Sequence, residues 1–294
     1  MKPGVDLVSV FTFEGSGGNP CPIVVNGQGL APDGMQAVAR QHGHESGFVL
    51  PPANQDYDLS LRFWVPNHEM EMCGHATIGA LWLLASNGAL SGDTVRIETR
   101  SGPVTGFVRY GAGNQPSVEI TQPAGRVTGL TPSQAQDVLA VLGLCHRDLL
   151  DLPIQNAITS RVKTLVPIKD VDRLNALKSD MQAVEALCHR IGSTGLYPYA
   201  VQDRQAQIFE ARQFPRSSGY PEDAATGIAA AALSFGLLAN GLVEKNDKPI
   251  RVFQGRAMGA LSAIGVRLGF AGGRAIGCLL GGAVERLEHA PTSS

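Results

Sequence analysis

Two stretches of this sequence decide the fold: CGHATIGALWLLASNG at Cys73–Gly88 and TGIAAAALSFGLLANG at Thr226–Gly241. They align without a gap, so that Gly74 falls on Gly227 and both stretches end in Asn-Gly. A helix that is apolar on every side belongs inside a protein core. A strand-like run and a polar loop with proline precede each stretch. The same order therefore occurs twice, which indicates a duplicated domain.

Both stretches lie in longer segments without charge, Met72–Gly92 and Ala224–Val243, whose length raises the possibility of membrane spans. Each segment contains several Gly and Asn residues, and each ends its helical part at Asn-Gly. Such a composition is not that of a lipid-facing helix, and the helical part is too short to cross a bilayer. We predict two buried helices of a globular protein and no membrane span.

The remaining sequence predicts mostly strands, with helices at 31–43 and 131–143. Thr131 and Gln134 have the spacing of a capping box at the start of the second helix. We predict an α/β fold of two pseudo-symmetric domains, residues 1–125 and 126–278. A last strand within 279–294 is expected to return to the first domain.

Composition excludes several classes of function. The formal net charge is −2 and the charged residues make up 17% of the chain, so no basic surface for nucleic acid or anionic membrane is expected. The five cysteines are widely spaced and form no C-x-x-C pair, which favours a reducing compartment. The first residues lack the apolar core and cleavage site of a signal peptide. We expect a cytoplasmic protein.

Metal and nucleotide motifs are also missing from the sequence. Histidines and cysteines occur, but no H-E-x-x-H or paired cysteine spacing links them. No G-x-G-x-x-G motif follows a strand and opens a helix. We predict neither a metal nor a cofactor.

The starts of the two apolar helices, at Gly74 and Gly227, are candidate binding positions. The first turn of a helix leaves about four backbone N–H groups without partners, and these favour anions. Glycine at the start lets a ligand approach the backbone closely. One reading is a cleft between the two domains for a small carboxylate. The other is that each start is capped by its own loop, and the pattern alone leaves both open.

Five segments in order along the chain resemble the signature blocks of the PhzF family (phenazine biosynthesis-like proteins). They are GGNPCPIVV at 17–25, HESGFV at 44–49, FWVPNHEMEMCGHATIGA at 63–80, YPEDAATGIAAAAL at 220–233 and QGRAMGALSAIGV at 254–266. The resemblance implies the diaminopimelate-epimerase-like fold, in which each of two similar domains wraps a curved, mostly antiparallel sheet around a central helix. It also implies an active site between the domains, a homodimer, and an isomerase that needs no cofactor.

By this resemblance, Glu45 takes a proton from one carbon of the substrate and returns it to another. A carboxyl group can act first as base and then as acid when burial brings its pKa toward neutrality. His75 and Asp223 would be polar residues around the substrate. The other positions implied to line the substrate site are Asn19, Ser46, Gly74, Thr226, Gly227 and Ile228.

Two positions depart from the expected pattern and keep alternatives open. Cys73 stands where epimerases of this fold carry the first of two catalytic cysteines, but Thr226 stands at the second, and a hydroxyl is far too weak an acid to replace a thiol. Cys73 could still react if the helix N-terminus lowers its pKa.

Ile228 stands where a serine is expected, so the phenazine precursor is in doubt as substrate. The alternatives are an amino-acid or hydroxy-acid epimerase or dehydratase that uses Cys73, and a binding protein without turnover.

Overall fold

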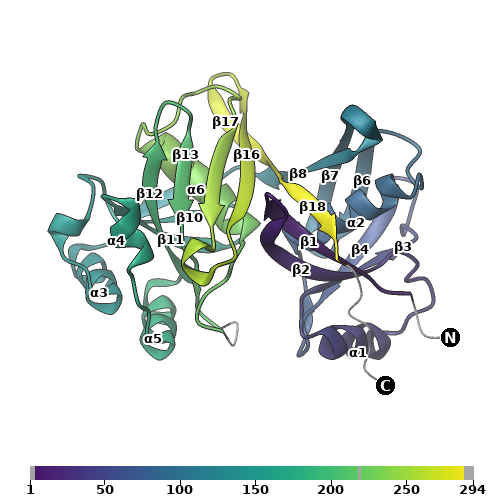
Figure 1. The fold of residues 1–294 in the computed structure, drawn as a ribbon, viewed down its shortest axis with the longest axis horizontal. Helices are drawn as coiled ribbons and strands as arrows, with labels where there is room; N and C mark the ends of the chain where they lie inside the picture. Colours follow the sequence, from purple (N-terminus) through teal and green to yellow (C-terminus); the bar gives the residue numbers. More distant parts are fainter. Residues whose placement is uncertain (1–3, 218–219, 288–294) are drawn as a thin grey trace. The chain divides into compact units, whose positions relative to one another are not determined.

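The computed structural model describes residues 4–217 and 220–287, which form two compact units (Figure 1). Unit 1 is Met1–Thr121 with Gly281–Ser294, and unit 2 is Gln122–Leu280. The boundaries expected from the sequence, 125/126 and 278/279, lie within a few residues of these. The C-terminal part of the expected strand, residues 288–294, lies outside the described residues.

Unit 1 contains two α-helices and nine strands among its described residues. The helices are α1 (Pro32–His42) and α2 (Gly74–Ser86). The strands are β1 (Asp6–Phe13), β2 (Ser16–Val24), β3 (Ser46–Leu50), β4 (Leu59–Trp64), β5 (Glu69–Met70), β6 (Thr94–Thr99), β7 (Gly102–Tyr110), β8 (Pro116–Pro123, which runs into unit 2) and β18 (Ala283–Arg286).

Unit 2 adds four α-helices and a second set of strands. The helices are α3 (Pro132–Leu142), α4 (Val171–Asn175), α5 (Met181–Ile191) and α6 (Gly227–Ala239). The strands are β9 (Arg126–Gly129), β10 (Gln155–Ile158), β11 (Val162–Ile168), β12 (Gly195–Asp203), β13 (Ile208–Ala211), β14 (Phe214–Pro215), β15 (Ile250–Gln254), β16 (Ser262–Ala271) and β17 (Arg274–Gly281).

The same pairing pattern occurs in both units. In unit 1, β1–β2 is antiparallel, β2–β3 parallel, β3–β4 antiparallel, β4–β6 parallel and β6–β7 antiparallel. In unit 2, β10–β11, β11–β12, β12–β13, β13–β15 and β15–β16 repeat that series in the same order. The helices occupy matching places in the chain too. α1 connects β2 to β3, and α4 with α5 connects β11 to β12, which are the first parallel pairs of the two units. α2 lies between β4 and β6, and α6 lies between β13 and β15, which are the second parallel pairs. The duplication predicted from the two apolar stretches is therefore visible in the topology.

A buried helix lies at the centre of each unit. α2 packs against β1, β2, β3, β7 and β18, and α6 packs against β9, β10, β11 and β16 (Figure 1). Both helices begin one residue after an extended N-cap, Cys73 or Thr226, and both end at Asn followed by Gly with φ of +66°. Burial of all faces explains why neither helix carries charge. No helix in residues 4–217 and 220–287 is long and apolar enough to cross a membrane.

The structure differs from the sequence prediction in a few elements. The last strand, expected within 279–294, is the short β18, which begins at Ala283 and pairs with β1 of unit 1. Helices α4 and α5 and strand β10 were not predicted. The capping box at Thr131 and Gln134 is present as predicted.

Candidate active site

Glu45 is placed by the short connection between α1 and β3. α1 ends at Gly43, whose left-handed conformation (φ +69°) turns the chain toward the start of β3. A Cβ atom at Gly47 would lie 2.9 Å from Cδ1 of Ile23 and 3.3 Å from Cβ of Ala76. A side chain at position 47 would crowd Ile23 and the first turn of α2, so the glycine of the HESGFV segment favours the close approach of β3 that brings Glu45 to the helix start.

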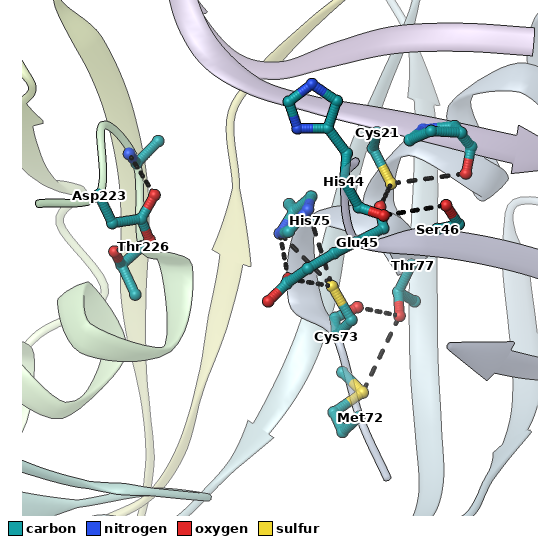
Figure 2. Close-up of polar contacts among 12 residues, drawn as sticks. Cys21, His44, Glu45, Ser46, Met72, Cys73, His75, Thr77, Asp223 and Thr226 are labelled. Carbon is teal, nitrogen blue, oxygen red and sulfur yellow. Dashed lines mark hydrogen bonds and ion pairs between the residues drawn. The ribbon is translucent and has the colours of Figure 1, made fainter. Parts of the chain in front are cut away.

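Three side chains converge there: Glu45, Cys73 and His75 (Figure 2). The Cys73 thiol donates a hydrogen bond to Oε2 of Glu45 at 3.2 Å. Nδ1 of His75 lies 3.4 Å from Sγ of Cys73 and 3.6 Å from Oε2 of Glu45. The Glu45 side chain is 31% exposed, whereas that of His75 is only 8% exposed. The group thus presents one accessible carboxylate held by two buried partners.

Hydrogen bonds to the backbone fix this arrangement. The Thr77 hydroxyl donates to the carbonyl oxygen of Cys73 at 2.8 Å. The Cys21 thiol donates to the carbonyl oxygen of Glu45 at 3.0 Å, so strand β2 supports Glu45 from a second side. The Ser46 hydroxyl donates to the carbonyl oxygen of His44 at 3.1 Å. Ser46 is fully buried, and this hydrogen bond gives it a place in the support of Glu45.

Burial raises the pKa of the Cys73 thiol well above its ordinary value of 9.0, and the charge of Glu45 and the neighbouring Cys21 act in the same direction. The backbone N–H of Ala76 acts in the opposite direction and is outweighed. The helix N-terminus therefore acts on this pKa in the expected direction, but loss of water around the sulfur outweighs it and the net pKa is raised. At neutral pH, Cys73 is an uncharged thiol that donates to the carboxylate.

A second polar group surrounds the start of α6 in unit 2. The Thr226 hydroxyl donates to Oδ2 of Asp223 at 2.5 Å. The buried Gln254 amide donates to the Asp223 carbonyl oxygen at 2.7 Å and to the Thr226 hydroxyl at 3.1 Å. Its oxygen accepts from the hydroxyl of Tyr197 at 2.9 Å. Burial and the charge of Asp223 raise the pKa of Tyr197, which keeps it a donor.

Two further features hold the segment that precedes α6. Arg212 makes a nearly buried, bidentate ion pair with Glu222. Its Nε and Nη2 atoms donate to Oε1 and Oε2 at 2.8 and 2.7 Å. Gly255, with φ of +87°, leaves room for the chain, since a Cβ there would lie 2.8 Å from the carbonyl oxygen of Ala224. Neither Arg212 nor Gln254 was predicted as a site residue. The QGR motif at 254–256 was the one signal in the sequence that pointed to Gln254.

The other predicted residues lie in β2 and in the first turns of α2 and α6. Gly74 and Gly227 are the first residues of α2 and α6. Asn19 lies in β2, opposite Val10 of β1 and two residues before Cys21. Ile228 is half-buried in the first turn of α6. In unit 1 the structure thus brings together Glu45, Cys73 and His75, and in unit 2 Asp223 and Thr226.

The chain matches the sequence model of the PhzC-PhzF family, phenazine biosynthesis-like protein, over residues 8–276. It belongs to this family. The uncharacterized isomerase YddE of Escherichia coli O157:H7 is 30% identical over 296 residues, which cover 99% of this chain and 98% of that protein. The match therefore extends over both units and includes both polar groups.

Solved structures agree on the fold. The PhzF-family phenazine biosynthesis protein of Bacillus anthracis gives a TM-score of 0.85 at 23% identity and covers 97% of this chain and 96% of its own. A probable proline racemase of Agrobacterium radiobacter K84 gives a TM-score of 0.62 at 13% identity, with 98% and 94% covered. These findings confirm the predicted family and the two-domain epimerase-like fold. The relatives' names confirm the predicted enzyme class, an isomerase.

Proposed function

We propose that this PhzF-family protein is a cofactor-independent isomerase that moves a proton between two carbons of a small carboxylated amine or enamine, with Glu45 as the single proton carrier. One observation carries the proposal: the partly exposed Glu45 carboxylate is held by the Cys73 thiol and by His75 at the start of α2. A base that is fixed in place, and still reachable, suits abstraction of a proton from carbon.

The proton is conserved through the reaction. The Glu45 carboxylate takes a proton from one substrate carbon and leaves the electron pair in the conjugated system of the substrate. The resulting carboxylic acid then delivers that proton to a second carbon, which restores the enzyme. Cys73 and His75 keep the carboxylate oriented during both steps, and the neutral Cys73 thiol supplies a donor without competing as a base.

The substrate class follows from the two helix starts. First-turn N–H groups of α2, approached over Gly74, suit a substrate carboxylate. Asp223, with Thr226 bonded to it, suits an amino group. Ile228 puts an apolar side chain in the first turn of α6 in place of the expected serine, which disfavours the phenazine precursor. The homodimer and the cytoplasmic location stay predictions.

Two observations count against the alternative of an amino-acid or hydroxy-acid epimerase or dehydratase that uses Cys73. The second position is Thr226, whose hydroxyl proton is bound to Asp223. The first, Cys73, has a raised pKa and is a poor base at neutral pH. A single-carboxylate mechanism needs neither residue to ionise.

The test is incubation of the enzyme in D₂O with a panel of small carboxylates, including dihydrohydroxyanthranilate, followed by NMR. The wild type should incorporate deuterium at carbon into at least one substrate, and Glu45→Gln should not. Glu185→Gln, the same chemical change on the exposed face of α5, should behave as the wild type. Undiminished exchange by Glu45→Gln would remove Glu45 from its role.

A further inference from the structure

The Glu45, Cys73 and His75 side chains also have the geometry of a set of metal ligands. Sequence spacing predicts no metal site, because Glu45 lies far along the chain from the other two and only the fold brings it to them. The ligand atoms of all three lie within 4.8 Å of one another, in the one such group found among residues 4–217 and 220–287. A carboxylate, a thiol and an imidazole are the three ligand types that zinc prefers.

The distances fit a shared ion. The three separations, Sγ to Oε2, Sγ to Nδ1 and Nδ1 to Oε2, are 3.2, 3.4 and 3.6 Å. Ligands that bind one tetrahedral ion at about 2.0–2.3 Å lie about 3.3–3.6 Å apart. An ion could therefore enter with small side-chain movements and no rearrangement of α2 or β3. Three protein ligands also leave a fourth position for water, which the partly exposed side of Glu45 can supply.

We propose that Glu45, Cys73 and His75 form a binding site for a thiophilic divalent cation of the Zn²⁺ class, and that the bound ion blocks the proton carrier. The sulfur and nitrogen ligands favour Zn²⁺ over Mg²⁺ or Ca²⁺, which prefer oxygen. Binding replaces the Cys73 thiol proton, which is released to the solvent, so the affinity rises with pH.

Inhibition by the ion rests on the proposed function, since it assumes that Glu45 carries the proton. Cation binding does not, because it depends only on the three ligands. The two can be separated by following the metal directly rather than through turnover.

The experiment is titration of the reduced wild-type protein with Co²⁺, a spectroscopic substitute for Zn²⁺. One equivalent should bind with a thiolate-to-cobalt charge-transfer absorption, and Zn²⁺ should displace it. Cys73→Ser and His75→Gln should each weaken binding by at least about 100-fold, with folding checked by circular dichroism. Zn²⁺ should also stop deuterium exchange, and a chelator should restore it.

The matched control is Cys145→Ser, the same substitution at a half-exposed thiol that lies 3.1 Å from Oδ2 of Asp148 and next to His146. It should bind Co²⁺ as the wild type does. Absence of the charge-transfer band in the wild type, or its survival in Cys73→Ser, would overturn the proposal, as would its loss in Cys145→Ser. If the metal-free wild type shows no deuterium exchange into any substrate, the proposed function is contradicted. The conclusion that the three side chains bind a cation would still hold.

Discussion

At the scale of single residues, the decisive feature is the protonation of Cys73. The sequence places a cysteine at a helix N-terminus, a position that commonly makes a thiol reactive. The structure buries the same sulfur and directs it toward the Glu45 carboxylate, so both burial and charge keep the proton on it. Its role therefore changes from a candidate base to a donor that holds the base.

This assignment predicts the reactivity of Cys73. Its alkylation by iodoacetamide should be slow at pH 7 and should rise continuously as the pH passes 9, because only the thiolate reacts and the pKa is raised. Glu45→Gln should react faster at each pH, since it removes a negative charge next to the sulfur. Mass spectrometry of the modified peptide gives the rates. A Cys73 alkylation rate that reaches a plateau below pH 8 would contradict the raised pKa.

At the scale of elements, the start of α6 depends on Gln254 of β15. Its amide donates to the Asp223 carbonyl oxygen and to the Thr226 hydroxyl, and its oxygen accepts from the Tyr197 hydroxyl. Gln254 is fully buried, so water cannot replace these bonds if one is lost. One neutral side chain thereby connects a strand to the segment that carries two predicted site residues.

Gln254→Glu should therefore destabilise the protein by about 1–3 kcal/mol, because it replaces two donated hydrogen bonds with a buried oxygen facing other oxygens. Urea unfolding measures the change. Gln202→Glu, the same substitution at an exposed position of β12, should have little effect. Equal stabilities for the two variants would show that the network contributes nothing to the folded state.

The elements also show what could be read from the sequence. The two central helices were predictable because Asn-Gly stops and uniform apolarity are local signals. Helix α5 was missed although Asp180 caps its start and Gly192 its end. The contact between Glu45 and Cys73 joins a loop to a distant helix start, and it depends on strand pairing and on the close packing at Gly47. No pattern in one sequence specifies such a contact, and only the family resemblance pointed to Glu45.

At the scale of the whole molecule, burial of thiols links stability to alkaline pH. Burial raises the pKa of Cys188 to about 11 and that of Cys278 to about 12, and it raises those of Cys21 and Cys73 as well. Above pH 9 the unfolded chain loses these protons while the folded chain keeps them, so the free energy of unfolding falls as pH rises.

Unfolding by urea under reducing conditions should therefore show a loss of stability between pH 9 and pH 10. The slope is about 1.4 kcal/mol per pH unit for each thiol that stays protonated in the folded state. Cys188→Ala should have a shallower slope than the wild type, whatever its stability at pH 7. A flat profile from pH 8 to pH 10 would contradict the burial of these thiols.

The measurement that tests the central claim most directly compares Glu45→Gln with Cys73→Ser in deuterium exchange on one substrate of the wild-type enzyme. Serine keeps a hydrogen-bond donor next to the carboxylate, whereas glutamine removes the proton carrier. The account predicts that Glu45→Gln loses about 10²–10⁴-fold in exchange rate and that Cys73→Ser loses far less. The reverse order, with exchange abolished by Cys73→Ser and retained by Glu45→Gln, would contradict it and make the thiol the catalytic group.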